Sequence, residues 1–150
     1  MSEGVKDRYK RINYFKSELN NYRYYQQRLE ELKLELELIE YELQGVKGIS
    51  YGGTSIENKE SQAEKDMKKL LLIQQKGEVE RKIDSTKQAI VKVDYVLSMI
   101  CDEFKELVMR LYILKNTSYE NQLNKFPGYS LTKLKNDVAR EIYKCIRKLY

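Results

Sequence analysis

The chain has 150 residues, of which 34% are charged, and it carries a formal net charge of +5 with a single proline. This length allows one domain or two small ones, and the scarcity of Gly and Pro favours helices over sheets. The chain contains no histidine, which excludes the usual zinc-ligand sets and the Ser-His and Cys-His catalytic pairs. Lysine or carboxylate catalysis is left open. Because no Gly-rich phosphate loop or paired-carboxylate motif occurs, we expect neither an enzyme nor a cofactor.

Neither a membrane span nor a secretion signal is predicted. No apolar run approaches the ~20 residues that cross a membrane, and the first ten residues contain no apolar signal core. Cys101 and Cys145 stand far apart and outside any CxxC motif, as is typical of small apolar packing residues. We expect a cytoplasmic protein that makes no contact with a membrane.

Two long helices are predicted before residue 101. In the first, residues 6–44, apolar or aromatic side chains recur every three or four positions, at Ile12, Phe15, Leu19, Tyr22, Leu29, Leu32, Leu36, Ile39 and Leu43. In the second, residues 58–100, the spacing gives a coiled-coil register at Val79, Ile83, Thr86, Ile90, Val93, Leu97 and Ile100. Residues 45–57 hold four glycines between them. Gly45 is the expected helix stop, and Ser55 or Asn58 is the expected start of the next helix.

Each long helix has one apolar stripe and therefore needs a partner. Folding back as an antiparallel hairpin satisfies part of this need, and pairing between chains satisfies the rest. We expect a coiled-coil region over residues 1–101 with a Gly-rich loop at 45–57. We also expect a homo-oligomer, most simply a dimer, that is joined mainly through residues 6–100.

Residues 102–150 have the outline of a helix-turn-helix domain. Asp102 is the expected N-cap of a helix that ends near Lys115 and buries one face, formed by Phe104, Leu107, Val108, Leu111 and Leu114. A short helix from Tyr119, capped by Ser118, follows and buries Leu123 and Phe126.

A turn and a longer basic helix complete this domain. Pro127-Gly128 forms the turn, and Ser130 caps the final helix. That helix buries Leu134, Val138, Ile142, Cys145 or Ile146, and Leu149. The predicted fold class is therefore all-α, with a long antiparallel helical hairpin followed by a C-terminal helix-turn-helix domain.

Almost all of the excess positive charge lies on this final helix. Residues 130–150 contain six Lys or Arg and two Asp or Glu, whereas residues 1–101 contain 18 basic and 17 acidic residues. A basic face is often no more than a solvated surface, but here it begins at a capped helix that follows a turn, where recognition helices contact DNA. The candidate DNA-binding residues are Thr132, Lys133, Lys135, Asn136, Arg140, Lys144 and Arg147. A smaller basic patch on the first helix contains Lys6, Arg8, Lys10 and Arg11. It could contact phosphates or lie in water, and we favour water.

The layout resembles the RinA/ArpU-like phage regulators of late transcription. The similar residues are Arg110-Leu111-Tyr112, the run from Leu114 to Glu120, and Gly128-Tyr129-Ser130, beside the family's RY-x-x-G-x-S-W-E-E-I-A … G-Y-S pattern. In this match Tyr119 takes the aromatic position. Gln122-Leu123 replaces the usual Ile-Ala. Pro127 is an extra residue in the turn. If it rotates the final helix by part of a turn, Lys135 takes the place of Asn136 at the DNA bases.

The resemblance implies a sigma-factor region 4-like helix-turn-helix and a bacterial host cell. It also implies activation of a late phage operon for packaging or morphogenesis, with double-stranded DNA and host RNA polymerase as partners. The leading hypothesis is thus a phage or prophage DNA-binding transcriptional regulator. The alternative is a coiled-coil adaptor or inhibitor that acts by protein–protein binding. The charge asymmetry of the final helix favours the regulator.

Overall fold

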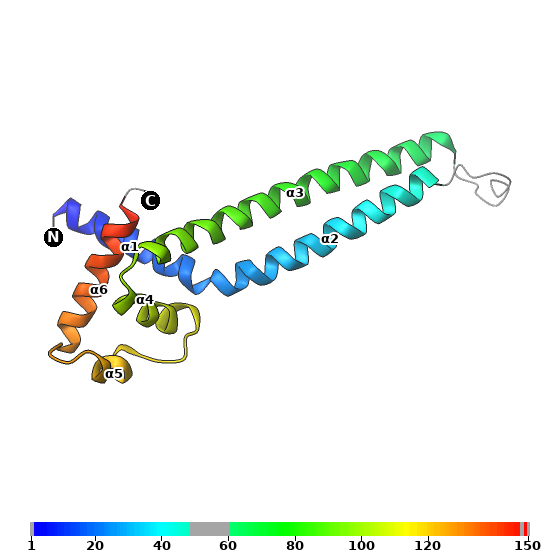
Figure 1. Cartoon of the computed structure of the whole chain (residues 1–150). Coiled ribbons are helices and arrows are strands. Elements are labelled where there is room, and N and C mark those ends of the chain that lie inside the picture. Colours follow the sequence, from blue (N-terminus) through cyan, green and yellow to red (C-terminus); the bar gives the residue numbers. More distant parts are fainter. Residues whose placement is uncertain (1, 49–60, 148, 150) are drawn as a thin grey trace. The chain divides into compact units, whose positions relative to one another are not determined.

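The computed structural model describes residues 2–48, 61–147 and 149, and within these every regular element is helical (Figure 1). The predicted all-α class is thereby confirmed for the described part of the chain. The elements are α1 (Glu3–Asn20), α2 (Tyr22–Gly48), α3 (Gln62–Met99), α4 (Asp102–Val108), η2 (Met109–Ile113), α5 (Tyr119–Gln122), η3 (Leu123–Lys125) and α6 (Leu131–Ile146).

The first predicted helix is in fact two helices. A turn at Asn21 separates α1 from α2, and the Asn21 N–H still donates to the Ser17 carbonyl at 3.1 Å. Two consecutive asparagines, which are weak helix formers, occupy this position. The predicted stop at Gly45 is also wrong, because α2 continues to Gly48. The remaining predicted loop, with the caps Ser55 and Asn58, lies outside the described residues.

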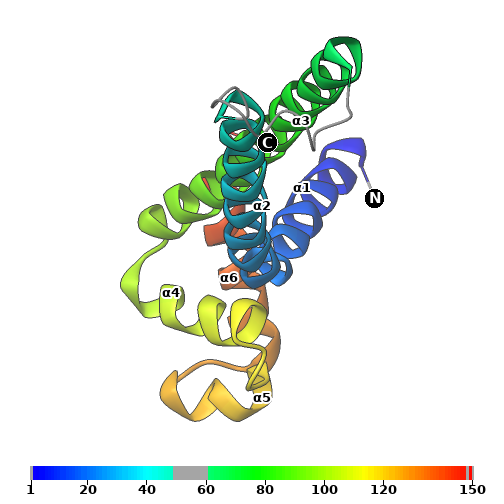
Figure 2. The same ribbon diagram turned by 90° about the vertical axis from the view of Figure 1, so that its right-hand side faces the viewer.

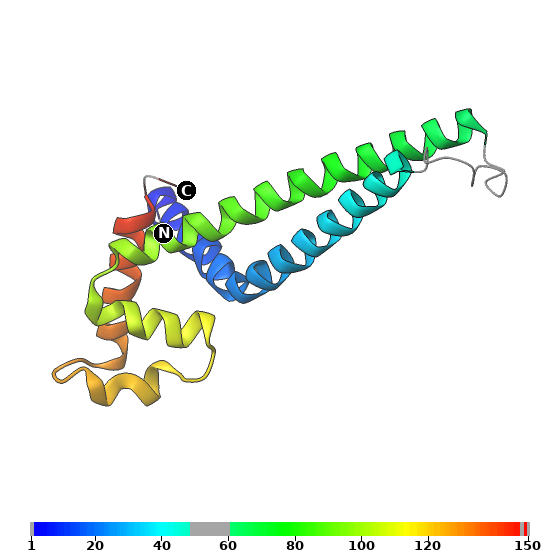
Figure 3. The ribbon, with the colours of Figure 1, turned by 45° about the vertical axis from the view of Figure 1, so that its right-hand side comes forward.

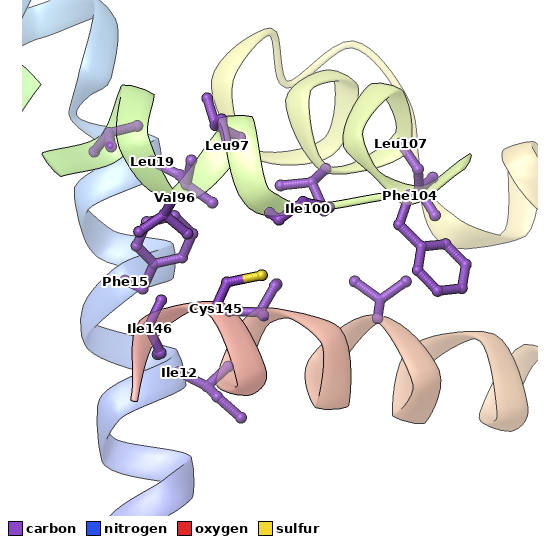
Figure 4. Packing of buried hydrophobic residues seen from close by; sticks show 14 of the residues in the cluster. Ile12, Phe15, Leu19, Val96, Leu97, Ile100, Phe104, Leu107, Cys145 and Ile146 are labelled. Carbon is purple, nitrogen blue, oxygen red and sulfur yellow. The ribbon is translucent and has the colours of Figure 1, made fainter. Parts of the chain in front are cut away.

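The chain divides into two compact units, and the division does not follow the expected boundary at 101/102. One unit joins residues 1–26 to residues 88–150, and the other contains the described part of residues 27–87. The reason is a shared core. Ile12, Phe15 and Leu19 of α1 point toward Cys145 and Ile146 of α6 and toward the end of α3 (Figure 4). Phe15 and Leu19 are fully buried. The final helix, α6, therefore packs against α1 and against the C-terminal end of α3.

In the second unit α2 and α3 lie side by side (Figures 1 and 3). Their shared core contains Leu32, Ile39, Leu43, Leu72, Val79 and Ile83. Lys76 Nζ lies 3.7 Å from a carboxylate oxygen of Glu40 across the pair. All nine stripe positions predicted for the first helix and all seven predicted for the second are buried or half-buried, so the predicted spacing is confirmed.

A π-helical turn, η2, follows α4 and changes which of the next side chains are buried. The Leu114 N–H donates to the Met109 carbonyl at 2.9 Å, a bond to the fifth residue back instead of the fourth. The extra residue in this turn rotates the following side chains. Ile113 is therefore buried, at 7% exposure, whereas Leu114, which was predicted to be buried, is 39% exposed.

Two further expectations about helix ends are corrected. The N-cap of α4 is Cys101, whose carbonyl accepts from the Phe104 and Lys105 N–H groups, and Asp102 is the first helical residue. Its carboxylate thus lies at the positive end of the helix dipole. Leu149 lies beyond the end of α6 and is 39% exposed, whereas Cys145 and Ile146 are both buried. Figure 2 shows α4, α5 and α6 gathered with α1 in the first unit.

Candidate nucleic-acid interface

Side-chain caps fix the starts of α5 and α6, as predicted. Ser118 Oγ accepts from the Asn121 N–H at 3.2 Å, and Ser130 Oγ accepts from the Lys133 N–H at 3.1 Å. Both cap residues have extended backbone, so each helix begins sharply. The start of the basic helix is therefore set by local hydrogen bonding.

The predicted turn precedes this start. The Tyr129 N–H donates to the Phe126 carbonyl at 3.1 Å, and Gly128 has φ +83°. Proline followed by a residue with positive φ is the pattern of a type II turn. Pro127 therefore belongs to a regular four-residue turn in this chain.

Three aromatic rings hold the turn against α4. The centroids of Phe104, Phe126 and Tyr129 lie 5.9–6.4 Å apart, and Tyr129 meets both phenylalanine rings edge to face. Such pairs add to the stability that burial alone provides. The Lys133 ammonium lies 4.9 Å from the Tyr129 ring centroid. The aromatic cluster thus links the turn, α4 and the first turn of α6.

Three of the residues that carry the family resemblance, Tyr112, Thr117 and Tyr119, make hydrogen bonds within this region. The hydroxyls of Tyr112 and Tyr119 lie 3.0 Å apart, and Gln122 donates to Thr117 Oγ1 at 2.9 Å. Burial, and then the hydrogen bond to Tyr112, raise the pKa of Tyr119 well above its usual value. Tyr119 is therefore a neutral packing residue that joins α5 to η2.

All seven predicted DNA-binding side chains are exposed. Five of them follow one another at steps of three or four on the side of α6 opposite its buried residues: Lys133, Asn136, Arg140, Lys144 and Arg147. We call these five residues the α6 basic row. Asp137 lies 3.8 Å from Arg140 and neutralises part of its charge.

Of the other two predicted residues, only Lys135 lies away from this row. Lys135 is directed to the α5 side of the helix, where its ammonium lies 5.6 Å from the Tyr119 ring centroid. Thr132 is exposed in the first turn of α6, about 40° around the helix from Asn136, and borders the row. The structure therefore brings together six of the seven predicted residues.

Two of the basic residues of α1, Arg8 and Arg11, contact α6, which the sequence interpretation did not foresee. The Arg8 guanidinium lies 5.1 Å from the Tyr143 ring centroid, and Arg11 donates to the Arg147 carbonyl at 3.4 Å. The sequence does contain a signal for this contact. Steps of three and four separate Val5, Arg8 and Ile12, which places them on one side of a helix that could face another helix.

Other kinds of site are not found in the described part of the chain. No group of three metal-ligating side chains occurs among its residues, and none of its helices is long and apolar enough to cross a membrane. Both cysteines are free thiols, and burial raises the pKa of Cys145.

In comparisons with known proteins, the chain matches no family model, no curated protein and no solved structure.

Proposed function

We propose that this protein is a double-stranded DNA-binding transcriptional regulator, and that α5, the turn and α6 act as its helix-turn-helix. The observation that carries the proposal is the α6 basic row, which begins at a capped helix start and is exposed along its length. The turn and the Phe104–Phe126–Tyr129 cluster support it, because they hold the first turn of α6 on a rigid scaffold. A recognition helix must be held rigidly at its N-terminal end if that end is to insert into the major groove of DNA.

In this proposal α6 enters the major groove with its N-terminal turns foremost. Thr132, Lys133, Asn136 and Arg140 then face base edges or nearby phosphates, and Lys144 and Arg147 contact phosphates farther along the strand. Lys135 is the residue that replaces Asn136 at the bases if the helix is rotated. The contact of Lys135 with the Tyr119 ring favours Asn136 for this role.

The antiparallel pair of α2 and α3 would then join two copies of the chain. Leu34, Leu38 and Tyr41 support this part of the proposal, because they form a second apolar stripe on α2 and are 60%, 64% and 75% exposed. They lie on the side of the helix opposite Leu32, so the shared core of α2 and α3 does not cover them. A dimer also presents two recognition helices, which suits a two-fold operator.

We propose that the protein's biological role is to activate late phage genes in the bacterial cytoplasm, with host RNA polymerase as a partner. It follows from the likeness of residues 110–130 to the RinA/ArpU-like regulators. The alternative is a coiled-coil adaptor or inhibitor. The same exposed stripe on α2 favours that alternative if its partner is another protein.

A gel-shift titration of random-sequence duplex at two salt concentrations separates these functions. A regulator that uses the basic row loses affinity steeply as salt rises, with a log–log slope of about −0.9 for each phosphate neutralised. An adaptor shows no binding at low salt. Lys144→Ala and Arg147→Ala should weaken binding to all sequences equally, whereas Lys133→Ala or Asn136→Ala should act on the cognate site, by about 1–3 kcal/mol.

A further inference from the structure

A groove of about 210 Å³ runs between α1 and α6. One wall is formed by Val5, Arg8, Tyr9 and Ile12, and the other by Asn136, Ala139, Arg140 and Tyr143. Both helices belong to the same compact unit, and Ile12 is buried together with Ile142 and Ile146 in its core. Both walls of the groove therefore belong to one compact unit with a shared core.

Positive charge is concentrated around this groove. Arg8 and Arg140 come from opposite walls. Arg11 does not line the groove, but it also joins the two helices, by donating to the Arg147 carbonyl at 3.4 Å. The carboxylates nearby are those of Asp7, 3.0 Å from Arg11, and Asp137, 3.8 Å from Arg140. The Arg8 guanidinium is supported by the Tyr143 ring, which leaves its N–H edge available to an anion.

The groove is continuous with the α6 basic row, because Asn136 and Arg140 belong to both. From Asn136 to Arg147 the row covers eleven steps along the helix, or roughly 16 Å, and a DNA strand carries one charge per 3.4 Å of axis. A DNA strand that follows the α6 basic row therefore places several phosphates along it, and some of them lie at the mouth of the α1–α6 groove. An arginine from a second element at this point suits phosphate oxygens, which guanidinium groups bind with two parallel hydrogen bonds.

We infer that α1 is a second DNA-contacting element, in which Arg8 binds a backbone phosphate at the mouth of the α1–α6 groove. This inference rests on the proposed function and adds a contact from the opposite end of the chain. Arg8 contributes affinity without sequence selectivity, because it faces the backbone and not the base edges. The basic row and α1 together hold one strand from both sides.

The test compares Arg8→Ala with Lys10→Ala in the full-length protein. Both residues are exposed on α1, but Lys10 lies on the far side of the helix and does not line the groove. We expect Arg8→Ala to weaken binding of random-sequence duplex roughly five- to tenfold at low salt. It should also reduce the magnitude of the log–log salt slope by about one. Lys10→Ala should leave both quantities unchanged.

Two further measurements separate the possible failures. Arg8→Lys keeps the charge and should keep the salt slope, and circular dichroism checks that every variant is folded. If the wild-type protein does not bind duplex DNA at all, the proposed function fails. If the wild type binds and Lys144→Ala weakens it, but Arg8→Ala binds as the wild type does, then only the role of α1 is overturned.

Discussion

Tyr22 of α2 donates a hydrogen bond to a carboxylate oxygen of Asp94 in α3, with 2.6 Å between the two oxygens. The bond joins residues that are 72 positions apart and lies within the first compact unit. Burial, and then this bond, raise the pKa of Tyr22 to about 12. It therefore fastens the beginning of α2 to the end of α3 near the core that supports α6.

Tyr22→Phe should reveal this bond in the pH dependence of stability. The folded state holds the hydroxyl proton more tightly than the unfolded state, so the bond contributes fully below about pH 10. We expect the variant to be about 1 kcal/mol less stable than the wild type at pH 8. That difference should shrink as the pH rises from about 10 to about 12. Urea unfolding at several pH values measures it, and a difference that stays constant to pH 12 would contradict the assignment.

The π turn makes a prediction about two adjacent residues. Ile113→Ala should lower the free energy of unfolding by about 2–4 kcal/mol, because Ile113 is buried in the core of the first unit. Leu114→Ala should cost less than about 1 kcal/mol, because Leu114 is partly exposed. Chemical denaturation of both variants measures the two effects. If Leu114→Ala lowered the stability more than Ile113→Ala does, residues 109–114 would continue α4 as an ordinary α-helix, without the π turn.

Backbone conformation gives opposite expectations at two positions. Lys115 has φ +54°, in the left-handed region that favours glycine, so Lys115→Gly should stabilise the protein by about 0.5–1 kcal/mol. Gly128→Ala should destabilise it by about 1–2 kcal/mol, because the turn needs the positive φ.

Gly77→Ala is the matched control for these two changes. Gly77 lies inside α3, where a Cβ would meet no atom closer than 3.6 Å. Alanine there should therefore stabilise the helix by up to about 1 kcal/mol. Thermal unfolding ranks the three variants, and a stabilising Gly128→Ala would refute the type II turn.

The exposed stripe on α2 predicts self-association. The double variant Leu38→Gln and Tyr41→Gln should shift a dimer toward monomer at micromolar concentration, because it removes apolar area from the proposed interface. Lys33→Gln, an exposed change about 80° or more around the helix from each residue of the stripe, serves as the control. Sedimentation equilibrium provides the masses. A wild-type protein that is monomeric at all concentrations would exclude the dimer.

Much of the local structure could be predicted from the sequence, because its signals act over a few residues. The apolar spacing identified the buried side of both long helices, and Ser118, Ser130 and Pro127-Gly128 marked the caps and the turn. The exposure of the basic row followed from the same periodicity.

Features that depend on distant partners could not be predicted. The stripe through Ile12 and Phe15 shows that one side of α1 is buried, but it does not show that α6 covers it. Arg8 is exposed, as expected, but its guanidinium also lies over the Tyr143 ring, a contact that the sequence interpretation did not foresee. The π turn was missed because one extra residue in a helix leaves no compositional signal.

The measurement that tests the central claim most directly is the affinity of a triple variant for random-sequence duplex DNA at low salt. Lys133, Arg140 and Lys144 are all changed to Ala, and circular dichroism confirms that the protein stays folded. All three side chains are exposed, so their removal should leave the core intact. We predict a large loss of affinity, and a salt slope whose magnitude falls by up to about three as phosphate contacts are lost. An unchanged affinity would show that the basic row is only a solvated surface, and the coiled-coil adaptor would then be the better account.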